Sequence, residues 1–251
     1  MNLWLVILGF LVSYLANITG AGYGTLLSPI LVILGFDIKA IVPSIVASQL
    51  IANTLLSILH HRHGNTDLSR NGGDLKLVAP LAVASAVGAM ISVSLLIGIP
   101  RRIAEYYLGL MLAILGVIIL KTRSSNKSSI NEGNFNIKLA ILSLIASINK
   151  GVTGGGLSPV LSVGQVLIGI DPKKAVSLTP LAVITSEIVM VASYIYTGLF
   201  TGSIDILVPL TIGALLAVPL IPYRVKRSSN NFIRTVMAST LIALGVAVLV
   251  I

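Results

Sequence analysis

Long apolar runs constrain this chain more than any other feature of its sequence. Residues 75–99, 175–196 and 232–251 each exceed the roughly 18 predominantly apolar residues that mark a bilayer-spanning helix. A single run of this kind could be a buried core helix, but a whole series could not. Hydrophobic residues make up 55% of the chain and charged residues 10%, whereas soluble domains carry roughly 25% charge. The sequence therefore predicts an all-α polytopic membrane protein with no soluble domain to hold an enzyme.

Charge and cysteine usage exclude several other classes of protein. The formal net charge is +9, but the Lys and Arg residues are spread over short loops, as topology signals are, so we expect no nucleic-acid partner. Cysteine is absent, which excludes disulfides, thiolate metal sites and thiol nucleophiles. We expect neither a cofactor nor a metal, and we interpret His60, His61 and His63 as interfacial. Residues 1–10 lack a basic region and a cleavage site, so we expect them to be retained in the membrane.

Some of the apolar runs are too short to cross a bilayer. Runs of about 11 to 14 residues form helices of roughly 17 to 21 Å, against a hydrocarbon core of about 30 Å. These short runs occur in two pairs, and each pair flanks a glycine-rich break. All the apolar runs together, short and long, cover residues 3–16, 25–35, 42–59, 75–99, 103–120, 137–148, 157–170, 175–196, 204–221 and 232–251.

The two breaks belong to an internal repeat. NITGAGYGTLLSP at 17–29 corresponds to NKGVTGGGLSP at 149–159. Further matches follow in the same order: GFD with GID, GNTD with GSID, and LGV with LGV. We therefore predict a first transmembrane repeat at 1–121, a cytoplasmic linker at 122–136 and a second transmembrane repeat at 137–251. The alternative is a structural duplication without a transport role.

Counting loop charges decides how the two halves are oriented, because short cytoplasmic loops are rich in Lys and Arg. If each interrupted pair crosses once, the two sides carry seven and nine charges, which is no bias. If each pair is a hairpin, one side carries only Lys39, Arg101 and Arg102, and the other carries thirteen. We therefore predict inverted repeats, each a broken re-entrant hairpin plus three transmembrane helices, with both termini external. Many secondary transporters have this architecture.

Non-helical backbone at membrane depth is tolerated where it lines a site. Helices beginning at Thr25 and Leu157 would present free N–H groups and partial positive charge, which favour an anion. The glycines could instead serve only helix packing, and the serines only capping. The candidate substrate-binding residues are Asn17, Gly22, Gly24, Thr25, Ser28, Gln49, Asn149, Lys150, Thr153, Gly154, Gly155, Gly156 and Ser158.

Two charged residues occupy unusual positions. Lys150 lies in the second break, where its ammonium could anchor an anion or could snorkel to the cytoplasmic surface. Glu187 is the only acidic residue deep in a long run, so it could couple transport to protons or make a structural hydrogen bond.

A glycine-rich break followed by a proline-containing helix, once in each half, resembles the TauE/SafE family of sulfite and organosulfonate exporters. The resemblance covers essentially the whole chain. The second motif, GVTGGGLSPVL at 151–161, is close to the family pattern, whereas GAGYGTLLSPIL at 20–31 lacks the glycine triplet. The resemblance implies a permease for sulfur-containing or other small organic anions.

These observations predict a secondary transporter that moves a small anion across the plasma membrane, with export as the direction, by alternating access between the two breaks. Its partners would be the anion, a coupling proton and the lipid bilayer. The alternatives are an anion channel, in which the broken helices line a continuous pore, and a cation carrier that uses Glu187.

Overall fold

The computed structural model describes residues 2–69, 73–121, 132–167, 170–200 and 204–250, and all regular structure in these ranges is helical. The helices are α1 (Leu3–Thr19), α2 (Tyr23–Ile33), α3 (Ile38–Arg62), α4 (Gly73–Gly98), α5 (Arg101–Lys121), α6 (Glu132–Thr153), α7 (Leu157–Leu167), α8 (Pro172–Tyr196), α9 (Ile204–Ala217), the 3-10 turn η1 (Val218–Leu220), α10 (Ile221–Arg227) and α11 (Asn230–Val250).

Five helical stretches in the described part of the chain are long and apolar enough to cross a membrane. They are Ile38–Arg62, Gly73–Gly98, Arg102–Lys121, Pro172–Tyr196 and Ile204–Arg227. Their outer faces carry large apolar side chains, such as Val83 and Met90, which are 68% and 65% exposed. An outer surface of this kind is stable against lipid rather than water. The prediction of an all-α, multi-pass membrane protein agrees with these features.

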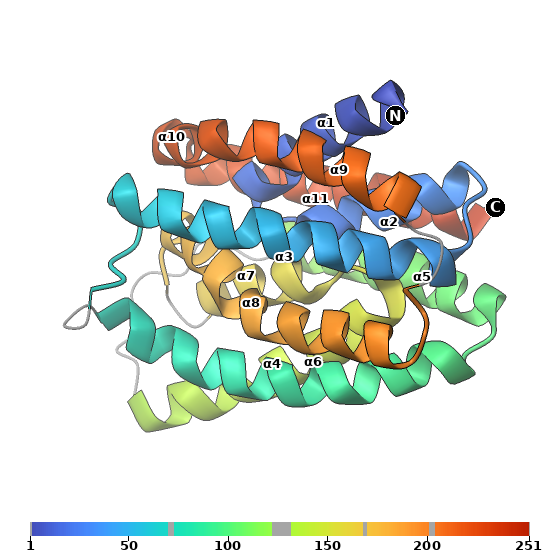
Figure 1. Ribbon diagram of the computed structural model, residues 1–251. Helices are drawn as coiled ribbons and strands as arrows, with labels where there is room; N and C mark the ends of the chain where they lie inside the picture. The colour runs from blue at the N-terminus through green and yellow to red at the C-terminus, as the bar shows by residue number, and fades with distance from the viewer. Residues whose placement is uncertain (1, 70–72, 122–131, 168–169, 201–203, 251) are drawn as a thin grey trace.

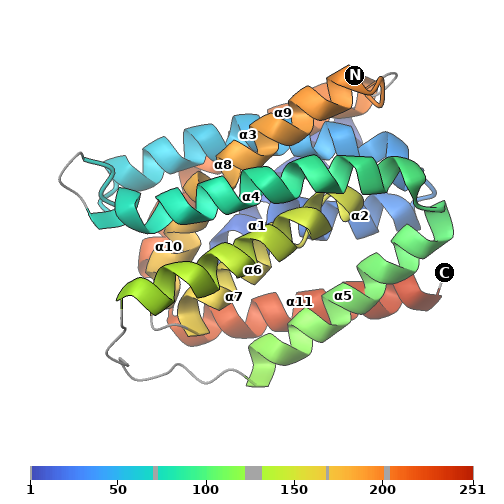
Figure 2. The same ribbon diagram turned by 90° about the horizontal axis from the view of Figure 1, so that it is seen from below.

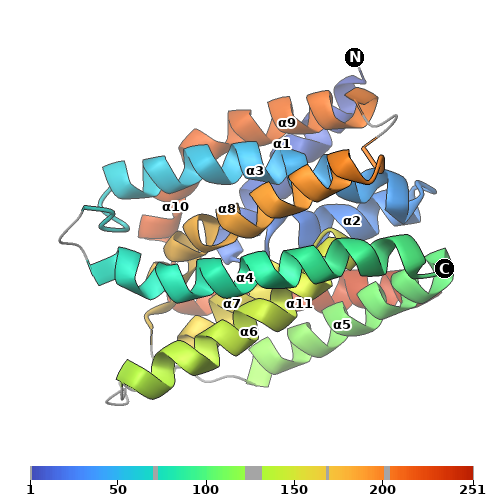
Figure 3. The same ribbon diagram turned by 60° about the horizontal axis from the view of Figure 1, so that its bottom comes forward.

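The helices form an elongated bundle in which most of them run between the same two ends (Figure 1). The N- and C-termini lie at one end, and α5 ends and α6 begins at the other (Figures 1 and 3). The pair α1 and α2 folds back toward the end at which it starts, and the pair α6 and α7 does the same from the opposite end.

Contacts between helices follow a two-fold pattern. In the first half α4 packs on α6 and α8, and in the second half α9 packs on α1 and α3. The remaining large contacts, α3 with α8 and α5 with α11, join equivalent helices of the two halves. Figure 2 shows α4 beside α6 and α5 beside α11. Equivalent helices of the two halves therefore make equivalent contacts.

Glycines allow the backbones to approach closely at these related contacts. A Cβ atom at Gly88 of α4 would meet the Leu144 carbonyl of α6, and one at Gly213 of α9 would meet the Val6 carbonyl of α1. Small residues commonly have this role between membrane helices, because they bring backbones together without a side chain between them.

Helix boundaries differ from the prediction in several places. The helix before each break is longer than predicted, because α1 extends to Thr19 and α6 to Thr153. Lys150, which we predict to lie in the second break, is therefore in the last turn of α6.

The start of α7 at Leu157 agrees with the prediction. In the first half α2 begins at Tyr23 rather than Thr25, so Ser28 and Pro29 lie in its second turn instead of its first. The predicted start of α2 is two residues late because Gly22 is its N-cap residue. Similarly, α6 begins at Glu132, inside the predicted linker, whose residues 122–131 lie outside the described ranges.

Candidate functional site

The two breaks share one backbone geometry. Gly20 and Gly22 have φ angles of 76° and 80°, and Gly154 and Gly156 have φ angles of 74° and 85°. A side chain is strained in this left-handed region, which is why glycine occupies these positions. Thr19 in the first break and Thr153 in the second each donate a hydrogen bond back into the preceding helix. The first break therefore reproduces the second without a glycine triplet.

This geometry sets the register of the repeat. Gly20 and Gly22 lie 134 residues before Gly154 and Gly156, which is also the separation of Asp37 from Asp171. Asp37 and Asp171 are the N-cap residues of α3 and α8, and each accepts a hydrogen bond from the backbone N–H two residues later. The same separation relates Asn53 of α3 to Glu187 of α8.

The two breaks contact each other directly. The backbone N–H of Gly156 donates a hydrogen bond of 2.8 Å to Thr25 Oγ1 in the first half. A Cβ atom at Gly155 would lie 2.5 Å from Thr25 Cα, and one at Gly22 would lie 2.6 Å from Ser158 Cβ. Glycine is therefore required for the close approach of the two breaks, as well as for the turn within each.

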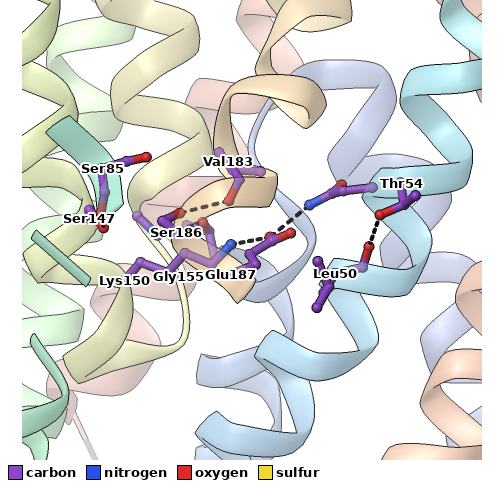
Figure 4. Close-up of polar contacts among 12 residues, drawn as sticks. Leu50, Thr54, Ser85, Ser147, Lys150, Gly155, Val183, Ser186 and Glu187 are labelled. Carbon is purple, nitrogen blue, oxygen red and sulfur yellow. Dashed lines mark hydrogen bonds and ion pairs between the residues drawn. The ribbon is translucent and has the colours of Figure 1, made fainter. Parts of the chain in front are cut away.

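A buried ion pair lies beside the breaks. Figure 4 shows Lys150 of α6 and Glu187 of α8 pointing toward each other. The Lys150 ammonium donates to Glu187 Oε1, and the side chains are 1% and 0% exposed. The Asn53 amide donates to the same oxygen at 2.8 Å. Snorkelling of Lys150 to the surface is therefore wrong for this conformation.

A small cavity lies next to this group. Its volume is about 10 Å³, which is enough for about one water molecule. Three of its lining residues were predicted as site residues, whereas Asn53 and Thr179 were not. The full lining is Asn17, Gly20, Gly22, Asn53, Ser158, Val176, Thr179 and Pro180.

Several buried polar atoms near the breaks lack a hydrogen-bond partner within the described part of the chain. They include Ser28 Oγ, Gln49 Oε1 and Glu187 Oε2. A Cβ atom at Gly154 would lie 2.5 Å from Ser28 Oγ, and one at Gly24 would lie 3.0 Å from the Gln49 amide. Because buried polar groups are usually paired, such a cluster is typical of a place where water or a ligand completes the hydrogen bonding.

The remaining predicted residues also lie at the breaks. Asn17 donates to the Ser13 carbonyl and lines the cavity. Asn149 accepts a hydrogen bond from the Tyr107 hydroxyl of α5, which the sequence did not suggest. Asn53 could have been found from the sequence, because the separation of Asp37 from Asp171 makes it the counterpart of Glu187.

The sequence analysis interprets all three histidines as interfacial, but the structure buries one of them inside the protein. His60 is fully buried, and its Nδ1 lies 3.0 Å from the Asn65 side-chain nitrogen. His61 and His63 are exposed at the end of α3, and their interfacial position stays a prediction. His60 is buried because the loop after α3 folds back, so that Asn65 also reaches the Pro222 carbonyl of α10.

Apolar helices of spanning length define the class of a multi-pass membrane protein. The family model described as sulfite exporter TauE/SafE matches residues 5–248, and the chain belongs to that family. The resemblance found in the sequence is thereby confirmed. Comparisons with curated proteins and with solved structures give no match.

Proposed function

We propose that this protein is a secondary transporter that exports a small anion, such as sulfite or a sulfonate, across the plasma membrane by alternating access. The observation that carries the proposal is the direct contact of the two glycine breaks beside the buried Lys150. Family membership supports a sulfur-containing anion as the substrate.

The chemistry at the breaks suits an anion. The N-termini of α2 and α7 begin at the two breaks, and helix N-termini carry free N–H groups and partial positive charge. Lys150 is a buried cation beside the breaks. Once its ammonium is released from Glu187, its contact with an anion would be a charge-assisted hydrogen bond. A cation carrier is less well supported, because Lys150 already neutralises Glu187.

Inverted halves are supported by the distribution of charge over the two ends of the bundle. At the end that holds both termini, the basic residues of the described loops and helix ends are Lys39, Arg101 and Arg102. Cytoplasmic ends carry the excess of Lys and Arg, so the opposite end is proposed to be cytoplasmic and both termini external. That end holds Arg62, Lys76, Lys121, Lys138, Lys173, Lys174, Arg224, Lys226, Arg227 and Arg234.

Equivalent lysines make equivalent contacts at opposite ends. Lys39 near the start of α3 donates to the Ile97 carbonyl at the end of α4. Its counterpart Lys173, near the start of α8, donates to the Lys226 carbonyl at the end of α10. Such a relation is expected of two halves inserted in opposite directions. In a transporter of this architecture, rocking one half against the other would expose the breaks to each side of the membrane in turn.

The cavity at the breaks is too small in this conformation to hold a small organic anion. It holds about 10 Å³, whereas a conducting channel needs a continuous path. An anion larger than water would require the two halves to separate at the breaks. The proposed conformation is therefore one that is closed around the site.

Flux measurements in proteoliposomes test the proposal. Purified protein would be assayed with sulfite, thiosulfate, sulfonates and carboxylates, with protein-free liposomes as the control. We expect saturable efflux of at least one sulfur-containing anion, accelerated by the same anion on the opposite side. Unitary conductance in planar bilayers would indicate a channel, and no saturable flux of any anion would contradict the proposal.

A further inference from the structure

We propose that Lys150 is shared between Glu187 and the transported anion, so that each anion bound is accompanied by one proton on Glu187. The inference rests on the proposed function and deepens it, because it assigns the coupling ion and its stoichiometry. The geometry that points to it is the single buried ion pair that Lys150 makes beside the breaks.

The first step concerns the positions of the two partners. Lys150 lies on the last turn of α6, directly before the second break, and its ammonium is directed to Glu187. The Tyr194 hydroxyl of α8 donates to the neighbouring Gly151 carbonyl at 3.0 Å, which holds the end of α6 against α8. In the proposed step the ammonium turns from Glu187 toward the breaks while α6 stays in place.

The second step concerns charge. Lys150 and Glu187 together are neutral, and both are buried. An anion that bound with both groups ionised would leave a net negative charge in the membrane, and an uncompensated buried ion costs several kcal/mol. A proton taken up from the aqueous phase onto Glu187 removes that charge and releases the ammonium to the anion. The number of charges in the site is then the same before and after binding.

The third step concerns where the proton goes. Glu187 Oε1 accepts from both Lys150 and Asn53, whereas Oε2 has no partner among the described residues. Oε2 is therefore the oxygen that can take a proton without losing a hydrogen bond. Asn53 can remain on Oε1 in both states, which keeps the carboxyl group in place.

No other charged group in the described helices packed on α8 competes for this role. Helices α1 and α7 contain no charged residue. On α3 and α4, the charged residues lie in the terminal turns, as Lys39, Asp74 and Lys76 do, and those of α10 follow its first turn. Lys150 and Asn53 are thus the charged and polar partners that face Glu187 from other helices.

The test uses methanesulfonate, which remains a monoanion between pH 5 and pH 9, so that any pH dependence belongs to the protein. Proteoliposomes would be loaded with this anion and with a pH-sensitive dye. We expect one proton to leave with each anion, so that the lumen becomes alkaline and the rate is unaffected by a potassium diffusion potential. Because one proton is bound with each anion, the affinity of the wild type for methanesulfonate should fall by at most about tenfold for each pH unit, once the pH exceeds the range in which Glu187 titrates.

Two variants make the assignment specific. Glu187→Gln keeps the size of the side chain but not its titration, so anion exchange should continue without proton movement, and affinity at alkaline pH should exceed that of the wild type. Ser186→Ala is the matched control on α8, because among the described residues Ser186 bonds within its own helix, to the Val183 carbonyl. It should keep both proton movement and pH dependence.

The outcomes separate this inference from the proposed function. Saturable wild-type efflux of methanesulfonate without proton movement would overturn the coupling and leave the transporter intact. Proton movement retained in a folded Glu187→Gln protein would also overturn it. Absence of saturable flux for methanesulfonate and for every other anion tried would remove the proposed function and this inference together. If Glu187→Gln fails to fold, the wild-type proton count still decides.

Discussion

At the scale of single residues, Lys150 and Glu187 form the most consequential contact in the described part of the chain. Each is buried, and each has the other as its charged partner. Removing one partner of a buried pair costs about 3–5 kcal/mol, because the other charge is left uncompensated, whereas replacing both by neutral groups is often tolerated. This asymmetry makes it possible to separate folding from substrate binding at the pair.

The first prediction concerns the loss of the Lys150 ammonium. Lys150→Ala should raise the apparent KM for the anion about 10- to 150-fold or abolish transport, because a charge-assisted contact is worth about 1.5–3 kcal/mol. Lys150→Arg should keep part of the activity. Initial rates of efflux over a range of anion concentrations give the KM.

The control for the first prediction is the neutral pair Lys150→Met with Glu187→Gln. It should be more stable than Lys150→Ala in unfolding by SDS followed by circular dichroism, yet equally defective in transport. Wild-type affinity in a well-expressed Lys150→Ala protein would rule out the anchor and leave the backbone N–H groups in the first turn of α7 as the anion donors.

The second prediction concerns the hydrogen bond that joins the breaks. Thr25 is buried, and its hydroxyl accepts from the Gly156 N–H at 2.8 Å. Thr25→Val keeps the shape of the side chain but leaves this N–H unpaired, which should cost about 1–3 kcal/mol. Thr25→Ser should retain the bond. The same SDS unfolding assay compares the two, and equal stability of both variants would show that the bond contributes little.

At the scale of helices and their connections, glycine determines how closely the breaks approach. Gly155→Ala would place Cβ 2.5 Å and 2.6 Å from Thr25 Cα and N, which are backbone atoms that cannot rotate away. Overpacking of this kind typically costs about 1–3 kcal/mol. We therefore predict, as a third expectation, lower stability and loss of transport in Gly155→Ala.

The matched control for the third prediction is Gly98→Ala at the end of α4, where an added Cβ would meet nothing within 4 Å. It should transport like the wild type. Stability and flux of the two variants would be measured in parallel, and an active Gly155→Ala protein would show that the breaks can separate at no functional cost.

The sequence predicted the helical class, the two breaks and the family, because apolar length and glycine clusters are local signals. It predicted the start of α7 at Leu157 but placed that of α2 two residues late, since Gly22 is the N-cap residue within a run of alternating glycines. The contact of Lys150 with Glu187 joins residues on different helices, and the burial of His60 depends on a loop that folds back to α10. Long-range packing of this kind leaves no pattern in a single sequence.

At the scale of the whole molecule, the two halves are related by packing as well as by sequence. The counterparts Asn53 and Glu187 meet where α3 crosses α8, so the central contact between the halves is made by equivalent positions. Only one of the two is acidic, and a lysine precedes only the second break, as Lys150 in the last turn of α6. The duplicated framework is thus unsymmetrical at its centre. We therefore expect the two halves to contribute differently to the proposed binding of the anion.

The last prediction tests the orientation of the bundle. Because the chain has no cysteine, single cysteines can be introduced without background. The charge count predicts that Asn126 in the linker is cytoplasmic and that Gly202 is external, but both lie outside the ranges that the structure describes. Exposed residues inside the described ranges take their place in the test: Ser69 after α3 and Thr197 at the end of α8. On intact cells a membrane-impermeant thiol reagent should label Thr197→Cys and not Ser69→Cys, and in permeabilised cells it should label both. The reason is that the end holding Ser69 carries most of the Lys and Arg residues and should face the cytoplasm. The reverse pattern on intact cells would invert the proposed orientation, and equal labelling of both positions would contradict the inverted-repeat topology.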